Sequence, residues 1–195
     1  MKIWMVLSMV SLIGVFLMGC QTSRAGYASA PYQVLRSDGK FELRDYPALT
    51  LVETPMRQAA RGADGGFMRL FGFISGGNAA KQKIAMTTPV LMSGSEEART
   101  MAFVMPANMK RDQVPKPADR SVTVRGMAAA RFAVLRYRGG RNAGQEARSL
   151  AELKAWMAAQ NLAQLSGPVY GYFDPPWTPT VLRHNEVMLQ TKADP

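Results

Sequence analysis

The chain has 195 residues and a formal net charge of +10 at pH 7, a length sufficient for one domain with a sizeable core. Its basic residues are scattered and no nucleic-acid-binding motif accompanies them, so we expect no nucleic acid partner. Solubility beside anionic lipid, or attraction of an anionic ligand, explains the charge better. Cys20 is the only cysteine, which excludes a disulfide within the chain.

The first 19 residues are predicted to be a signal peptide. Lys2 gives a positive start, and the run from Ile3 to Met18 is apolar and carries no charge. An uncleaved membrane anchor is the alternative, although the run is slightly short for a span. Residues 20–31 are small and polar, and are predicted to be a flexible tether that leads into the domain at residue 32.

The first half of the domain, about residues 32–106, is predicted to contain one helix among its strands. Phe67, Leu70, Phe71 and Ile74 recur at i, i+3, i+4 and i+7, which predicts a helix at about 64–75. Gly76 and Gly77 are expected to end it. Strands are predicted at 32–35 and 41–46, which form a hairpin, and at 49–54, 84–92 and 101–105.

The second half, about residues 120–192, repeats the same order of elements. A connection at 106–120 with three prolines separates the halves. Strands are predicted at 121–125, 131–137, 169–173 and 186–190, with a helix from about 144 to 160. Two copies of strand, helix, strand, strand predict an α+β domain, either a barrel or a sandwich, with the helices outside or across it.

Four segments in order resemble the SOUL haem-binding protein family, and together they cover roughly residues 32–190. They are Phe41–Pro47 (FELRDYP); Phe67–Pro89 with its KIxMTxPV pattern through Lys83, Ile84, Met86, Thr87, Pro89 and Val90; Phe103, Met105 and Pro106; and Tyr172–Trp177 with Arg183–Val187. Two departures stand out. Phe173 separates Tyr172 from Asp174, and His184 replaces the second arginine of the family pattern.

The resemblance implies a duplicated β-α-β-β fold, a distorted antiparallel β-barrel with two main helices, in a single domain over 32–192. The family shares this fold with small-molecule sensor domains of bacterial regulators. It also implies reversible, non-covalent binding of haem or another tetrapyrrole in an apolar groove beside the first helix. The family has no obligatory axial histidine, so the resemblance assigns no iron ligand.

The N-terminal segment resembles a bacterial lipoprotein. Leu17-Met18-Gly19-Cys20 is similar to its cleavage site, which implies lipid on Cys20 and no free thiol in the mature chain. Cysteine nucleophiles, thiolate-ligated haem and cysteine zinc sites are then excluded. Gln21 resembles the sorting position of outer-membrane lipoproteins. We therefore expect a lipid-anchored protein of the cell envelope, at the outer membrane and facing the periplasm.

The candidate ligand-binding residues fall into three groups, and each has a structural alternative. A flat ligand needs an apolar slot, and the candidates, which are equally suited to an ordinary core, are Phe67, Leu70, Phe71, Ile74 and Met86. Lys81 and Lys83, with Arg69, are candidates for the propionates, or form a solvated basic loop. Trp177 is expected to cover apolar surface in a rigid loop first and to form a pocket rim second. His184 is the only histidine and so the only imidazole candidate for iron, with a surface role as the alternative and Met86 as a softer ligand.

Enzymatic activity is not expected, because no nucleophile elbow, phosphate loop or zinc-protease pattern is present. Some sensor-like relatives of this fold hydrolyse small electrophiles with a pocket glutamate. Glu42, Glu53 and Glu186 are the candidates for that minority alternative, and the sequence does not rank them. The expected function is haem binding for buffering or transfer. The alternative within binding is another hydrophobic anion.

Overall fold

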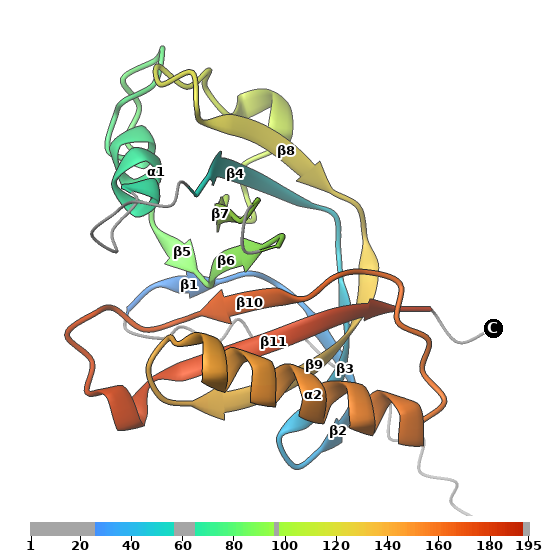
Figure 1. Ribbon diagram of the computed structural model, residues 1–195. Coiled ribbons are helices and arrows are strands. Elements are labelled where there is room, and N and C mark those ends of the chain that lie inside the picture. The colour runs from blue at the N-terminus through green and yellow to red at the C-terminus, as the bar shows by residue number, and fades with distance from the viewer. Residues whose placement is uncertain (1–25, 57–64, 96–97, 193–195) are drawn as a thin grey trace, which may run out of the picture.

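The computed structural model describes residues 26–56, 65–95 and 98–192. Within them, nine strands form one curled antiparallel sheet, half of a barrel, with two helices (Figure 1). The elements in this sheet and on it are β2 (Gln33–Asp38), β3 (Phe41–Tyr46), β4 (Leu49–Pro55), α1 (Gly66–Ile74), β6 (Val90–Ser93), β7 (Thr100–Val104), β8 (Thr123–Met127), β9 (Ala130–Arg138), α2 (Ala143–Ala159), β10 (Val169–Tyr172) and β11 (His184–Thr191). The strand order is β2-β3-β9-β11-β10-β6-β7-β4-β8.

The duplication predicted from the sequence is visible in the sheet order. One half forms the unit β4-α1-β6-β7, and the other forms β9-α2-β10-β11. The two units meet where β6 pairs antiparallel with β10. The remaining strands cross over, because β3 from the first half pairs with β9 and β8 from the second half pairs with β4. The predicted α+β fold is confirmed, with the barrel left half open.

Both helices pack on the same face of the sheet. Helix α1 contacts β4 and β7, and α2 contacts β9 and β11. Their buried side chains join one core with alternate residues of the strands, including Leu70, Phe73 and Ile74 from α1, Leu153, Trp156 and Met157 from α2, and Phe103, Leu135, Val187 and Leu189 from the sheet. Since side chains alternate along a strand, the residues between these point to the other face.

That other face is covered by the start of the described chain. Strand β1 (Ala28–Ser29) pairs parallel with β5 (Thr87–Thr88), and the hydroxyls of Ser29 and Thr88 lie 3.0 Å apart. The Ala30 amide donates to the Thr88 carbonyl at 2.8 Å, and both Ser29 and Ala30 are buried. Ser29 and Ala30, inside the predicted tether, are therefore packed against the sheet.

One strand prediction in the first half is wrong in detail. The strand expected at 84–92 is interrupted at Pro89, which separates β5 from β6 and leaves residues 84–86 outside any strand. Strand β6 lies inside the sheet, between β10 and β7, so the proline, which has no amide hydrogen, stands just before it. The predicted signal peptide, Cys20 and residues 21–25 lie outside the described residues. In the described part of the chain, neither helix has the length and apolar character needed to cross a membrane.

Candidate functional site

Helix α1 presents a row of large apolar side chains to solvent, which we call the α1 face: Phe67, Met68 and Phe71. Their exposed fractions are 41%, 64% and 42%. The rings of Phe67 and Phe71 are stacked, with centroids 6.0 Å apart and planes 12° from parallel. The rings of Phe67 and Phe103, a buried residue of β7, also pack edge to face, with centroids 5.3 Å apart. The α1 face is thus a partly exposed aromatic surface fixed to the core.

The predicted stripe of four residues divides between this face and the core. Leu70 and Ile74 are only 0% and 4% exposed and pack under the helix, with Phe73 beside them. They support the α1 face without being open to a ligand. Met86 is partly buried and packs against the same core. Met68 was not singled out from the sequence, because it does not follow the i, i+3, i+4 spacing of the stripe.

The loop after α1 carries Lys81 and Lys83 and is tied to the end of the helix by Asn78. The buried Asn78 amide donates to the carbonyls of Phe73 at 2.9 Å and Gln82 at 2.7 Å, and its oxygen accepts from the Gln82 amide at 3.0 Å. Gly76, with φ of +111°, starts the turn. Both lysines are exposed.

A shallow hollow of about 380 Å³ lies directly beside this loop. Its lining residues are Gln82, Asn108, Met109 and Gln113. Since Asn78 joins Gln82 to the last turn of α1, the helix end, the lysine loop and the hollow form one continuous region.

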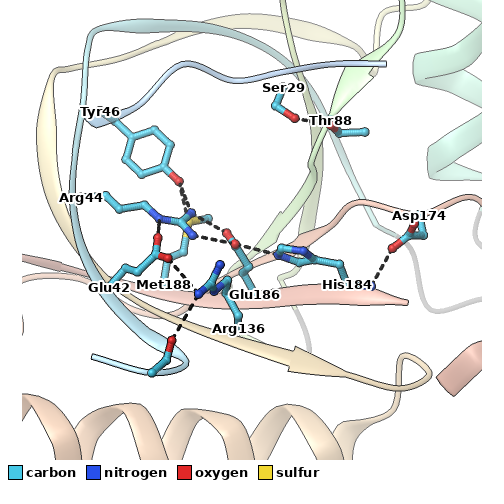
Figure 2. Close-up of polar contacts among 11 residues, drawn as sticks. Ser29, Glu42, Arg44, Tyr46, Thr88, Arg136, Asp174, His184, Glu186 and Met188 are labelled. Atoms are coloured by element: carbon cyan, nitrogen blue, oxygen red, sulfur yellow. Dashed lines mark hydrogen bonds and ion pairs between the residues drawn. The ribbon is translucent and has the colours of Figure 1, made fainter. Parts of the chain in front are cut away.

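The other face of the sheet holds a buried ionic cluster, which we define as Glu42, Arg44 and Glu186 (Figure 2). The Arg44 guanidinium donates to both carboxylate oxygens of Glu186 at 2.8 Å and to Glu42 at 2.6 Å. Arg44 also donates to the Tyr46 hydroxyl at 3.1 Å, and its guanidinium lies 4.1 Å from the centre of the Tyr32 ring. Burial alone would raise the pKa of Glu186, but the hydrogen bond from His184 and the charge of Arg44 outweigh it and hold that pKa below its usual range.

His184, the predicted imidazole candidate for iron, is part of this arrangement. Its Nε2 lies 2.8 Å from a Glu186 oxygen, and its ring packs on Phe173 with centroids 4.4 Å apart (Figure 2). The His184 amide donates to the Asp174 carboxylate at 2.6 Å. One ring nitrogen is therefore already engaged. Among the described residues, no group of three or more histidine, cysteine, aspartate or glutamate side chains is placed to hold a metal ion.

The glutamates considered for hydrolysis are all held in ion pairs. Glu42 and Glu186 belong to the buried cluster, and Glu42 also pairs with Arg136 at 3.0 Å. Glu53 pairs with Arg125 at 2.8 Å. A general base needs a carboxylate oxygen that reaches a substrate proton, and these contacts direct the oxygens to arginines instead.

A fourth glutamate, Glu146, was missed at the level of the sequence. It is buried in the first turn of α2. Its carboxylate accepts hydrogen bonds from the Tyr172 hydroxyl at 2.5 Å and from the Arg99 guanidinium at 3.1 Å. Burial and this hydrogen bond raise the pKa of Tyr172. Acidic residues in a first helical turn usually face solvent, where they complement the helix dipole, so nothing in the local sequence marks Glu146 as buried.

Trp177 lies away from α1, on the connection between β10 and β11 in the second half of the domain, and is 78% exposed. It does not cover apolar surface, contrary to the expectation from the sequence. The structure thus brings Phe67 and Phe71 together on the α1 face, connects the lysine loop to the same helix, and places Trp177 and His184 elsewhere.

Solved structures with the same fold have very different sequences. The crystal structure of the EcmrR C-terminal domain is 12% identical with a TM-score of 0.53, and the match covers 83% of this chain and 98% of that chain. The crystal structure of a hydrolase from Listeria innocua is 11% identical with a TM-score of 0.59, and the match covers 81% of this chain and 94% of that chain. At these identities the likeness concerns the fold alone. No curated protein matches the chain.

The family model described as SOUL heme-binding protein matches residues 27–190. The match begins at the packed segment before β2 and ends within β11, so it includes the α1 face, the lysine loop and the ionic cluster. The chain therefore belongs to the SOUL haem-binding protein family.

Proposed function

We propose that the protein binds haem or a related tetrapyrrole reversibly on the α1 face, for buffering or transfer. The observation that carries this proposal is the stacked and exposed pair Phe67–Phe71 on α1, a helix that is followed directly by a loop with two exposed lysines. A tetrapyrrole has a flat apolar ring and anionic propionates, and these two features match the aromatic surface and the lysines.

The residues present fit such a ligand in different roles. Phe67 and Phe71 would lie against the ring, with Leu70 and Ile74 as the buried support beneath them. Lys81 and Lys83 would pair with the propionates. Met68 provides the thioether on this face, and a thioether is one of the side chains that ligate haem iron. Iron supplies redox and ligand-binding chemistry when haem is bound, while the chain itself binds and orients the ring.

Binding is favoured over hydrolysis because Glu42, Glu53 and Glu186 are all paired with arginines. Another hydrophobic anion is the alternative ligand, since a flat apolar surface with cations does not by itself require a metal. The location that we propose for this activity is the cell envelope, with a lipid on Cys20 holding the domain at the outer membrane on its periplasmic side.

Haemin titration followed by Soret absorbance tests the proposal. The chain from Gln21 onward keeps every described residue and removes the apolar run of the signal peptide. We expect saturation at one haem per chain. Lys81→Ala/Lys83→Ala should weaken binding by about tenfold, as expected for two partly solvated charge-assisted contacts. Lys154→Ala/Lys192→Ala removes the same charge from exposed positions in the second half and should leave the affinity unchanged.

Two further results separate the alternatives. Competition by a long-chain fatty acid at equal potency would indicate a general site for hydrophobic anions. Binding that never saturates, or that is equally weakened by both lysine pairs, would contradict a defined site at α1. His184→Ala is expected to leave the Soret spectrum unchanged, because its Nε2 is engaged with Glu186.

A further inference from the structure

The connection between β10 and β11 holds three large apolar side chains in solvent: Trp177, Val181 and Leu182. We call them the 177–182 face. Their exposed fractions are 78%, 72% and 54%. Single exposed apolar residues are ordinary on a protein surface, but three on one short connection are a candidate interaction surface.

Local hydrogen bonds hold this connection in shape. The Arg183 guanidinium donates through Nε to the Thr178 carbonyl at 2.8 Å and through Nη2 to the Pro176 carbonyl. The Leu182 amide donates to the Pro179 carbonyl at 2.9 Å, which forms the short helix η2 (Thr180–Leu182). Because the backbone is fixed by these contacts, the apolar side chains are exposed by the folded connection itself.

Two arginines lie on the segment that contacts this connection, and one of them, Arg141, also lies 4.0 Å from a Glu146 carboxylate oxygen. Strand β10 ends and strand β11 begins at the same end of the sheet where β9 turns into α2 (Figure 1). A Cβ added at Gly140 in that turn would lie 3.2 Å from the Thr180 methyl group, so the two segments are in contact. Arg138 is opposite His184 in the pairing of β9 with β11, and the Arg141 guanidinium lies 5.9 Å from the centre of the Tyr172 ring. Both arginines are exposed.

We propose that the 177–182 face docks on the surface of an anionic lipid bilayer. Tryptophan favours the boundary between lipid and water, where its apolar ring and polar N–H are both accommodated. Branched aliphatic side chains beside it enter the outer acyl region, and arginines at the rim pair with anionic headgroups. A second copy of the chain fits less well, because the arginines of the two copies would face each other. This docking requires neither haem nor the predicted lipid anchor.

The fluorescence of Trp177 in the full-length chain reports on docking directly. The chain has three tryptophans, so the contribution of Trp177 is the difference between the wild-type protein and Trp177→Phe. The protein is reconstituted into vesicles of brominated phosphatidylcholine, with and without phosphatidylglycerol. We expect the lipid bromines to quench Trp177 when phosphatidylglycerol is present. Arg138→Gln/Arg141→Gln should lower the equilibrium constant for docking on the bilayer by about thirtyfold, the effect expected for two arginines at an anionic surface.

A matched variant controls for net charge. Arg111→Gln/Arg120→Gln removes the same charge from exposed positions in the connection between the two halves, and should not change the quenching of Trp177. Absence of lipid quenching of Trp177 in anionic vesicles would overturn the proposal, as would equal effects of the two arginine pairs. Protection of Trp177 from aqueous acrylamide that increases with protein concentration without vesicles would assign the face to a second copy and overturn it as well.

Discussion

The buried ionic cluster gives the sharpest prediction about stability. Glu186→Gln keeps the size of the side chain and removes its negative charge. In the folded protein both carboxylate oxygens of Glu186 accept from Arg44 at 2.8 Å, and one also lies 2.8 Å from His184 Nε2. The amide of glutamine would turn one acceptor into a donor facing the guanidinium. Arg44 would then remain buried with Glu42 as its single carboxylate partner.

The size of the effect follows from the burial of the pair. The side chains of Arg44 and Glu186 are 0% and 1% exposed, so neither charge regains water in the folded variant. Breaking a buried ion pair from one side costs about 3–5 kcal/mol. The free energy of unfolding of a single domain is about 5–15 kcal/mol, so Glu186→Gln should remove a large part of the stability.

Urea denaturation followed by tryptophan fluorescence measures this loss, because Trp156 is buried in the core. Glu53→Gln is the matched control. It makes the same chemical change at a pair with Arg125, whose side chain is half exposed, and should cost less than about 1 kcal/mol. Equal losses for the two variants would refute the assignment of the cluster as a stabilising element. The double replacement Arg44→Met/Glu186→Leu should be more stable than either of its single replacements, since it removes both partners of this ion pair together and Glu42 keeps its contact with Arg136.

Three further predictions concern other parts of the molecule. Folding lowers the pKa of the Glu186 carboxyl, so the ionised carboxylate stabilises the folded state fully above the unfolded pKa of about 4.3. This stabilisation is lost as the pH falls from there through the lower, folded pKa. Between about pH 6 and pH 3, the urea midpoint should therefore fall more steeply for the wild type than for Glu186→Gln. Asn78→Ala loses three hydrogen bonds that anchor the lysine loop and should cost about 2–3 kcal/mol in the same assay, while Asn108→Ala at an exposed position should cost little. Trp177→Ser should change the free energy of unfolding by less than about 0.5 kcal/mol, since the side chain is largely in solvent; a larger loss would show that Trp177 packs as the sequence suggests.

The order of strands and helices was predictable because hydrophobic periodicity is a local signal. The helix around Leu70 and most strands of both halves appear where the spacing places them, with shifted ends; the exception is the strand predicted at 84–92, which is interrupted at Pro89. The arrangement of the strands into one sheet is different. Strand β3 pairs with β9, far along the chain, and no local pattern specifies such a partner.

The division of the α1 stripe depends on where the sheet ends beneath the helix. Periodicity places Phe67, Leu70, Phe71 and Ile74 on one side of a helix, but it does not say how much of that side is covered. Strands β4 and β7 cover Leu70 and Ile74 and leave Phe67 and Phe71 partly open. The exposed part, which is the part available to a ligand, therefore required the structure.

The ionic cluster was missed because its residues alternate with apolar ones in β3. Glu42 and Arg44 alternate with the apolar Phe41 and Leu43, a pattern that normally indicates a strand with one solvated face. Here the other face is closed by the curled sheet and by the segment that leads to Tyr32, whose ring lies over Arg44. The partner Glu186 comes from the opposite end of the domain, 142 residues away, so the pairing exists only in the folded chain.

The most direct test of haem binding at the α1 face compares two exposed apolar pairs in a haemin titration. Phe67→Ser/Phe71→Ser removes the stacked rings from α1, and Val181→Ser/Leu182→Ser removes a more exposed pair from the second half. We predict that the phenylalanine variant loses at least about tenfold in affinity, as expected when a flat ligand loses two aromatic contacts, and that the other variant binds as the wild type does. Equal affinities for the two variants would contradict haem binding at this site.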